Sequence, residues 1–123
     1  MDAKIKEALE KDRVIDITTT GRQSGLARRI EIWFHNIDGT LYITGRPGKR
    51  RDWYANMEAN PNITFHLKQT TQADIPATVT PILDESARRE VLTRILEKLG
   101  YSDENVDEWV GASPLVEVSL QLT

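Results

Sequence analysis

Apolar and polar residues follow two different repeat periods along the chain. Alternation of apolar with polar positions is typical of strands that bury one face, and apolar residues at three- and four-residue spacings are typical of amphipathic helices. Alternation predicts six strands, at 14–20, 29–35, 41–44, 62–68, 73–79 and 115–122. Helical spacing and helix-forming composition predict helices at 2–11, 51–59 and 84–99, with a weaker helical turn at 102–109.

Turn and cap residues separate several of these segments. Asp38-Gly39 stands between two predicted strands and is typical of a tight hairpin turn. Asp84 can cap the start of the clearest helix, and Gly100 suits its exit. Pro76 has no N–H to donate to a neighbouring strand. We therefore expect the strand that contains Pro76 to lie at a sheet edge or to carry a bulge.

Strands joined mainly by hairpins, with the helices kept apart from them, predict an α+β fold. Its antiparallel sheet of about six strands would be closed or nearly closed into a barrel. The 123 residues fit one domain, with a helix at 1–12, a core at 14–68 that carries the candidate site, and further strands and helices at 69–123. No apolar run approaches the roughly 18 residues of a membrane span, and the first residues mix charges. We expect a cytoplasmic protein without an integral membrane segment.

Positive charge is concentrated in one part of an acidic chain. The formal net charge is −3, yet residues 22–53 carry an excess of four positive charges. Their seven basic residues are Arg22, Arg28, Arg29, Arg46, Lys49, Arg50 and Arg51. Like charges crowded on one face repel each other unless an anion neutralises them. The charge pattern therefore indicates an anionic ligand.

Two glycine-containing loops in this window match such a ligand. Segment 20–25 reads Thr-Gly-Arg-Gln-Ser-Gly, and segment 45–51, Gly-Arg-Pro-Gly-Lys-Arg-Arg, leads directly into a predicted helix. Each loop alone is consistent with a plain strand connection. Together they offer cations and free backbone N–H groups, which bind phosphate or carboxylate oxygens. With a pI near 5.4, a compact anion is favoured over nucleic acid as the ligand.

Other kinds of chemistry find little support in the residue types present. Cysteine is absent, which excludes disulfides and thiolate nucleophiles. Ser24 has no partners in a triad arrangement, so nucleophilic catalysis is not predicted. The predicted strand 29–35 places Ile30, Ile32 and Phe34 inward, and both His35 and His66 are expected to point outward. Without convergent histidines or carboxylates, we predict no metal site.

The two segments together resemble a known family. The Thr-Gly-Arg-Gln-Ser-Gly run at 20–25 and the Trp-Tyr-Ala-Asn run at 53–56, followed by Asn60-Pro61, are similar in order and spacing to the deazaflavin-dependent nitroreductases and quinone reductases. The resemblance implies a split β-barrel and the cofactor F420, a deazaflavin with a phosphate and a glutamate tail. It also implies an oxidoreductase that transfers hydride to a small acceptor such as a quinone, an enone or a nitro-aromatic.

The same resemblance implies a set of site residues. The cofactor-binding candidates are Arg22, Gln23, Ser24, Arg28, Arg29, Ile30, Ile32, Thr44, Gly45, Arg46, Pro47, Gly48, Lys49, Arg50, Trp53, Tyr54 and Asn56. The family's usual serine-lysine-glycine-glycine run is replaced here by 46–48, so the cations at 49–51 are candidates for the lost lysine contact. Tyr101 is the candidate for a pocket wall or proton donor.

Several alternatives remain open at the level of sequence. Trp53-Tyr54 is consistent with plain core packing as well as with a wall for a flat heterocycle. The barrel fold also serves flavin mononucleotide (FMN), so an FMN-dependent reductase is one alternative. A non-catalytic barrel that binds a cofactor or another anion is a second. A homodimer is consistent with the chain, and the edge expected around Pro76 is a candidate surface for it.

Overall fold

The computed structural model describes residues 2–101 and 103–122. Within them the helices are α1 (Ala3–Lys11), α2 (Asp52–Ala59), α3 (Glu85–Leu99) and α4 (Val106–Ala112). The strands are β1 (Val14–Thr20), β2 (Ala27–Trp33), β3 (His35–Ile37), β4 (Thr40–Thr44), β5 (Asn62–Leu67), β6 (Ala73–Pro81) and β7 (Leu115–Leu120). None of the described helices is long and apolar enough to cross a membrane.

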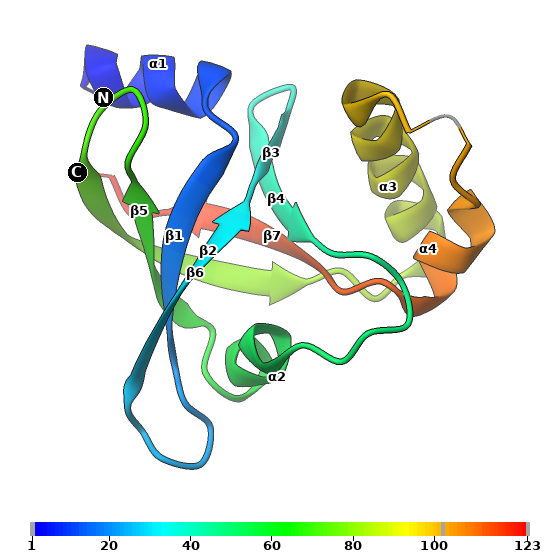
Figure 1. Cartoon of the computed structure of the whole chain (residues 1–123), viewed down its shortest axis with the longest axis horizontal. Helices are drawn as coiled ribbons and strands as arrows, with labels where there is room; N and C mark the ends of the chain where they lie inside the picture. The colour runs from blue at the N-terminus through cyan, green and yellow to red at the C-terminus, as the bar shows by residue number, and fades with distance from the viewer. Residues whose placement is uncertain (1, 102, 123) are drawn as a thin grey trace.

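The strands form one curled antiparallel sheet (Figure 1). Among the described residues it has seven strands in the order β2-β1-β5-β6-β7-β4-β3. The two edge strands, β2 and β3, follow each other in the chain with only Phe34 between them. One residue spans less than 4 Å. The sheet must therefore curl until its two edges meet at this point, which gives an open barrel and confirms the predicted α+β class.

The predicted strand 29–35 is wrong as a single strand, because it breaks at Phe34 into β2 and β3. The N–H of Phe34 donates to the carbonyl of Arg13, which continues the pairing with β1 by one step, and the next residue, His35, already pairs with Tyr42 of β4. Ile30, predicted to point inward, is 36% exposed. The break explains why the sheet has seven strands where six were predicted.

The hairpin at Asp38-Gly39 is confirmed. Ile37 pairs with Thr40, which leaves these two residues as the whole loop. Asp38 and Gly39 both have positive φ, 52° and 92°, as a type I′ turn requires. The side-chain oxygen of Asn36 accepts a hydrogen bond from the N–H of Gly39. Local sequence alone was enough to specify this turn.

The expectation that Pro76 marks a sheet edge is wrong. Its strand, β6, lies between β5 and β7, and Pro76 pairs with Thr64 in the ladder. The carbonyl of Pro76 accepts from the N–H of Gln121, just beyond the end of β7. A strand residue directs its nitrogen and carbonyl to the same side. The missing N–H therefore faces the end of β7, where the paired region has stopped, and the ladder loses little.

Two apolar clusters support the fold. The first fills the barrel and includes Ile17, Ile43 and Phe65, with Phe34 packed edge-on against Phe65 at 5.3 Å between ring centroids. The second lies between α3, α4 and the start of β7. In Figure 1, α3 and α4 stand together at one side of the barrel, and α1 covers one of its ends. The helices thus leave the region around α2 as a separate part of the surface.

The helix α2 lies between the β1–β2 loop and the loop that follows β4 (Figure 1). It begins directly after Arg51, whose side chain makes no capping hydrogen bond to the helix. Trp53 and Met57 anchor it in the barrel core, and Asn56 is buried beside them. This anchoring fixes α2 against both glycine-containing loops.

Candidate functional site

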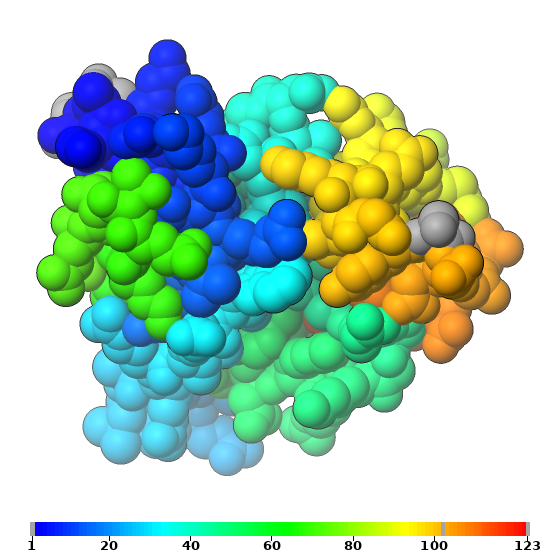
Figure 2. All heavy atoms as spheres, turned by 45° about the horizontal axis from the view of Figure 1, so that its top comes forward, coloured from blue at the N-terminus to red at the C-terminus, as the bar shows by residue number. Residues whose placement is uncertain are grey.

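A cavity of about 660 Å³ lies between the β1–β2 loop, β2 and the start of α2. Figure 2 shows the light-blue hairpin and the green segment that contains α2 side by side, with a recess between them. Eight predicted residues line the cavity: Arg22, Gln23, Ser24, Arg28, Ile30, Arg50, Trp53 and Asn56. Its volume is within the usual range of small-molecule sites. The two sequence motifs therefore meet in one place.

Asn56 joins the two motifs directly. It is only 4% exposed, and its Oδ1 accepts hydrogen bonds from the backbone N–H of Arg22 at 3.2 Å and from Nη1 of Arg22 at 2.9 Å. Its Nδ2 donates to Oγ1 of Thr19 at 3.2 Å. One buried amide thus holds the end of strand β1 and the loop after it against α2. These hydrogen bonds give a physical reason why the motif at 53–56 and the motif at 20–25 occur in the same sequence.

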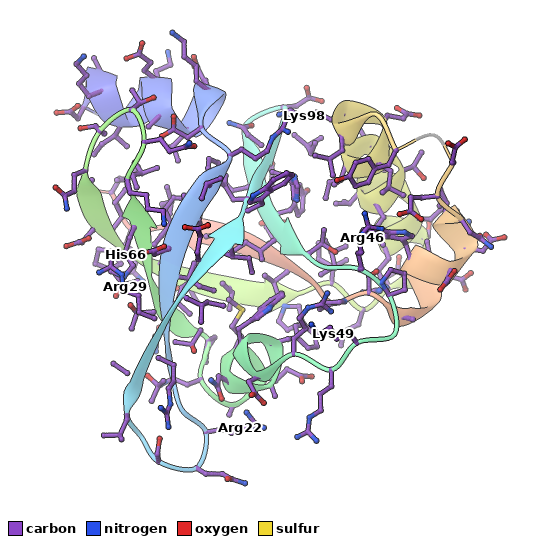
Figure 3. The ribbon with its side chains drawn as sticks, in the orientation of Figure 1. Arg22, Arg29, Arg46, Lys49, His66 and Lys98 are labelled. Atoms are coloured by element: carbon purple, nitrogen blue, oxygen red, sulfur yellow. The ribbon has the colours of Figure 1, made fainter. Side chains whose placement is uncertain are left out.

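Arg22 is oriented by a second contact at the mouth of the cavity. Its Nη2 lies 3.2 Å from Oδ1 of Asp52, whose side chain is 82% exposed. Figure 3 shows Arg22 at the β1–β2 loop, on the side of α2 that faces the hairpin. So exposed an ion pair contributes little to folding stability. Its main effect is to direct the guanidinium across the cavity entrance.

The glycines of the β1–β2 loop are explained by its turn. A Cβ on Gly21 would lie 2.6 Å from Oγ of Ser24, and Gly25 has a φ of 71°. Oγ of Ser24 accepts from the N–H of Leu26, and Arg28 reaches it at 3.5 Å. The compact turn holds the serine hydroxyl and the arginine side by side on the cavity wall.

The second loop is organised by Arg51. Its Nη1 donates to the carbonyls of Arg46 at 3.1 Å and Lys49 at 2.9 Å. A Cβ on Gly45 would lie 2.8 Å from Cζ of Arg51, so a larger residue at this position would push the guanidinium aside. Among the described residues, Lys49 and Arg50 have no side-chain hydrogen bond or ion pair. Arg50 therefore presents an uncommitted positive charge to the cavity.

The adjacent aromatic residues point to different places. Trp53 is 8% exposed and belongs to the barrel core while also lining the cavity. Tyr54 contacts Trp53 edge-on at 6.0 Å and lines a second cavity on the other side of the loop. Burial, and then the charge of Glu58, raises the pKa of Tyr54. Trp53 thus packs in the barrel core and also lines the cavity, so the two sequence-based interpretations of this residue do not exclude each other.

Other predicted residues lie outside the 660 Å³ cavity. Arg29 is paired with Asp16 at 3.0 Å on another face of β2, and Oγ1 of Thr44 donates to the carbonyl of Pro114. Also absent from its lining are Ile32, Gly45, Arg46, Pro47, Gly48, Lys49 and Tyr54. Four lining residues were missing from the predicted set: Thr19, Gly21, Arg51 and Asp52. The alternation that buries Ile15 and Ile17 also points to Thr19.

Tyr101 lies in a separate hollow of about 370 Å³. The guanidinium of Arg46 stands 5.4 Å above its ring, and the same guanidinium forms an ion pair with Glu104 (Figure 3 labels Arg46). Arg46 is therefore committed to this region. The structure does not bring Tyr101 and the arginines of the larger cavity into one site.

Both histidines lie on strand faces opposite the barrel core, as predicted, but they are buried rather than exposed to solvent. Nδ1 of His66 lies 2.7 Å from Asp74, which leaves Nε2 to accept from the hydroxyl of Thr18 at 2.7 Å in the neutral ring. Burial lowers the pKa of His35 to about 4, and the charges of Lys98 and Arg13 add to this effect. No cluster of three or more potential metal ligands occurs among the described residues.

The cavity wall suits a ligand with a phosphate or carboxylate group. Four arginines face it, against one acid, Asp52. Charge-assisted hydrogen bonds from guanidinium groups are among the strongest that bind such oxygens. Ile30 and Trp53 add an apolar section next to the basic one. This donor set fits the anionic part of F420, and the apolar section is compatible with a ring.

Several solved structures resemble this one over nearly its whole length. An F420 reductase has a TM-score of 0.70 and 16% identity, covering 95% of this chain and 93% of that one. An FAD-binding protein from Mesorhizobium loti has a TM-score of 0.67 and 16% identity, covering 99% and 91%. The heme storage protein HutZ from Vibrio cholerae has 0.71 and 14%, again covering 99% and 91%. At these identities the likeness establishes the split-barrel fold and leaves the ligand open.

Sequence comparison decides the family. No protein with a curated function matches the chain significantly. The sequence model of one family, described as F420H(2)-dependent quinone reductase, matches residues 1–119, which is almost the entire chain. The chain therefore belongs to the F420H(2)-dependent quinone reductase family, a family of F420-dependent oxidoreductases.

Proposed function

We propose that this protein uses reduced F420 to reduce a small acceptor, namely a quinone, an enone or a nitro-aromatic. The observation that carries the proposal is the basic cavity that both motifs build together, with Asn56 connecting them. Family membership supports the cofactor. The nature of the acceptor is the part that needs experiment.

The residues of the cavity have distinct roles in this proposal. Arg22, Arg28 and Arg50 bind the phosphate and carboxylate oxygens of the cofactor, and the hydroxyl of Ser24 adds a neutral contact. Ile30 and Trp53 form an apolar wall that limits water on one side. The bound deazaflavin supplies the hydride, so the protein needs to bind and orient rather than to perform acid–base chemistry.

The proton that the reduced acceptor requires has no evident donor in this cavity. Among its described lining residues the only side chain with a carboxyl group is Asp52, which is exposed and paired with Arg22. The cavity is open to water, so we propose that solvent supplies the proton. Tyr101 stays a candidate for this role from its separate hollow. An unchanged kcat in a Tyr101→Phe variant would exclude it as the donor.

Anaerobic turnover tests the proposal. Reduced F420 is mixed with a naphthoquinone, a cyclic enone or a nitro-aromatic, and the return of the oxidised deazaflavin absorbance is followed with and without the protein. We expect acceleration with at least one acceptor, and none when reduced FMN replaces F420. Binding of F420 without turnover of any of the three would instead indicate a non-catalytic carrier. Turnover with FMN alone would reverse the cofactor assignment.

We also propose that the protein forms a homodimer through β2 rather than around Pro76. The β2 strand is an open edge of the sheet, and Ile30 and Trp33 on it are 36% and 42% exposed. Open strand edges with apolar side chains favour association. Mass measurement by light scattering after gel filtration tests this, and a monomer at all concentrations would refute it.

A further inference from the structure

Three side chains on the outer face of the sheet form a hydrogen-bonded series. Oγ1 of Thr18 on β1 lies 2.7 Å from Nε2 of His66 on β5. Nδ1 of the same ring lies 2.7 Å from Oδ1 of Asp74 on β6. Side chains alternate along a strand, so Thr18 points away from the 660 Å³ cavity that its neighbour Thr19 lines. No role in the function proposed above uses this cluster.

The order hydroxyl, imidazole, carboxylate is typical of an activated nucleophile. A carboxylate that accepts from Nδ1–H leaves Nε2 as the acceptor for the hydroxyl. Nε2 can then take the hydroxyl proton during an attack, and the carboxylate stabilises the imidazolium that forms. The hydrogen bond from His66 lowers the pKa of Asp74, so this carboxyl group is ionised at neutral pH. The cluster therefore has both a base and the charge that supports it.

The sheet holds this cluster in a fixed geometry. His66 pairs with Asp16 on one side and with Asp74 on the other. The histidine is only 6% exposed, so its neighbours restrict the orientation of the ring. Thr18 is half-buried, and the side chain of Asp74 is 69% exposed. The base is thus covered, while the hydroxyl-bearing residue remains in part accessible to a small molecule.

Arg29 adds a positive charge next to the hydroxyl. It pairs with Thr18 across the β1–β2 ladder, so both side chains lie on the same face of the sheet. Figure 3 labels Arg29 and His66 next to each other, and the charge of Arg29 also acts on Asp74. Its Nε donates to Asp16 at 3.0 Å, and its other N–H groups form no hydrogen bond among the described residues. These N–H groups can donate to an oxygen that becomes negatively charged.

We propose that Thr18 is an acyl acceptor, whose hydroxyl takes the acyl group of a small activated ester with His66 as the base. Oγ1 forms a bond to the carbonyl carbon while its proton passes to Nε2 of His66. The N–H groups of Arg29 donate to the carbonyl oxygen as negative charge develops on it. The bond from the carbonyl carbon to the leaving oxygen then breaks, and the leaving alkoxide or phenolate takes the proton from His66. Asp74 is a positioning residue in this step.

Acylation by p-nitrophenyl acetate tests the proposal. The protein is incubated with the ester at neutral pH, and the tryptic peptide 14–22, which contains Thr18, Thr19 and Thr20, is sequenced by mass spectrometry. We expect one acetyl group on Thr18 and none on the other two threonines. Hydroxylamine should remove this group, because it cleaves esters and leaves the amides that form at lysines.

Substitutions connect the reaction to the cluster. Thr18→Val removes the hydroxyl and should abolish the label, whereas Thr18→Ser should retain it. His66→Gln should slow the labelling by about 100-fold or more, which is the usual effect of a general base. Asp74→Asn should also slow it and leave urea unfolding nearly unchanged, because the carboxylate is exposed. Thr64→Val is the matched control and should react as the wild type, since Thr64 pairs with Thr18 and has no side-chain hydrogen bond among the described residues.

The outcomes separate an activated hydroxyl from a polar network that only stabilises the sheet. If the wild type carries no hydroxylamine-sensitive acetyl group on Thr18 after prolonged reaction, the proposal is overturned. Labelling that proceeds equally in the wild type and in Asp74→Asn would overturn it as well. The second variant decides the question even if His66→Gln, which changes a buried side chain, does not fold.

Discussion

The side chain of Asn56 forms hydrogen bonds with two residues that are distant from it in the sequence, Thr19 and Arg22. Its removal leaves the N–H of Arg22 and the hydroxyl of Thr19 without their partner. Groups that lose a buried partner cost about 1–3 kcal/mol. We predict that Asn56→Ala lowers the free energy of unfolding by about this amount in urea titration and weakens F420 binding.

The neighbouring asparagine Asn62 provides a matched control. It is exposed at the start of β5, and substitution of such a surface residue usually changes stability by less than about 0.5 kcal/mol. Asn62→Ala should leave both unfolding and F420 binding as in the wild type. Equal effects of the two variants would show that Asn56 does not connect the motifs in the way described.

His35 makes stability depend on pH. Its pKa is lowered from 6.5 to about 4 in the folded protein, first by burial and then by Lys98 and Arg13. The unfolded chain therefore binds the proton more readily, and stability present above about pH 6.5 is lost as the pH falls towards 4. We predict a loss of about 2 kcal/mol between about pH 7.5 and pH 5. Urea unfolding at several pH values measures it.

A His35→Gln variant isolates this contribution, because every other titrating group is kept. The variant will be less stable at neutral pH, since a packed side chain changes. Its stability should nevertheless fall much less steeply with acidification than that of the wild type. Parallel curves for the two proteins would mean that His35 does not retain a lowered pKa.

At the scale of elements, the loop between β4 and α2 depends on one glycine and one arginine. A side chain at Gly45 displaces the guanidinium of Arg51 and so breaks its bonds to the carbonyls of Arg46 and Lys49. We predict that Gly45→Ala increases trypsin cleavage in 49–51 several-fold, because an ordered loop resists proteolysis. Digestion followed by mass spectrometry measures the rate.

Arg51→Lys tests the same arrangement from the other side. A lysine keeps the charge and loses the planar fork that reaches two carbonyls. It should raise cleavage after the remaining basic residues as Gly45→Ala does, whereas Gly111→Ala, where a Cβ has open space, should not. Wild-type cleavage rates in both loop variants would contradict the role given to Arg51.

Elements that depend on neighbouring residues could be predicted from the sequence, and those that depend on barrel closure could not. The turn at Asp38-Gly39 and the helix between Asp84 and Gly100 need only their own caps and conformations. The break at Phe34 exists because the two edges of the sheet meet there, which no local pattern reports. Pro76 is tolerated inside the sheet because β7 ends beside it, again a property of the whole topology.

In the candidate site, too, some features could be predicted from the sequence and others depend on the folded structure. The glycine loop and Asn56 were found through their motif, and the structure places them together. Arg50 and Arg51 both line the cavity, yet the guanidinium of Arg51 is bound to the loop carbonyls while Arg50 has no side-chain partner among the described residues. Identical side chains next to each other carry no sequence signal for this difference. It depends on the space that Gly45 leaves.

At the scale of the whole molecule, ion pairs reduce the positive window found in the sequence. Arg29 is paired with Asp16 and Arg46 with Glu104, so the charge available to a ligand comes mainly from the cavity. We predict that raising salt from about 50 mM to about 500 mM weakens F420 binding several-fold, because salt screens exposed charges. The KM for a neutral quinone should change little. Fluorescence titration and steady-state kinetics measure the two effects.

F420 affinity in two matched double variants tests the central claim most directly. Arg22→Gln with Arg50→Gln removes two charges from the cavity, and Arg29→Gln with Arg46→Gln removes the same charge from paired arginines elsewhere. We predict that the first pair weakens binding by more than about tenfold and the second by less than about twofold. Equal losses in both pairs, or a wild type whose Kd is above about 1 mM, would contradict the account.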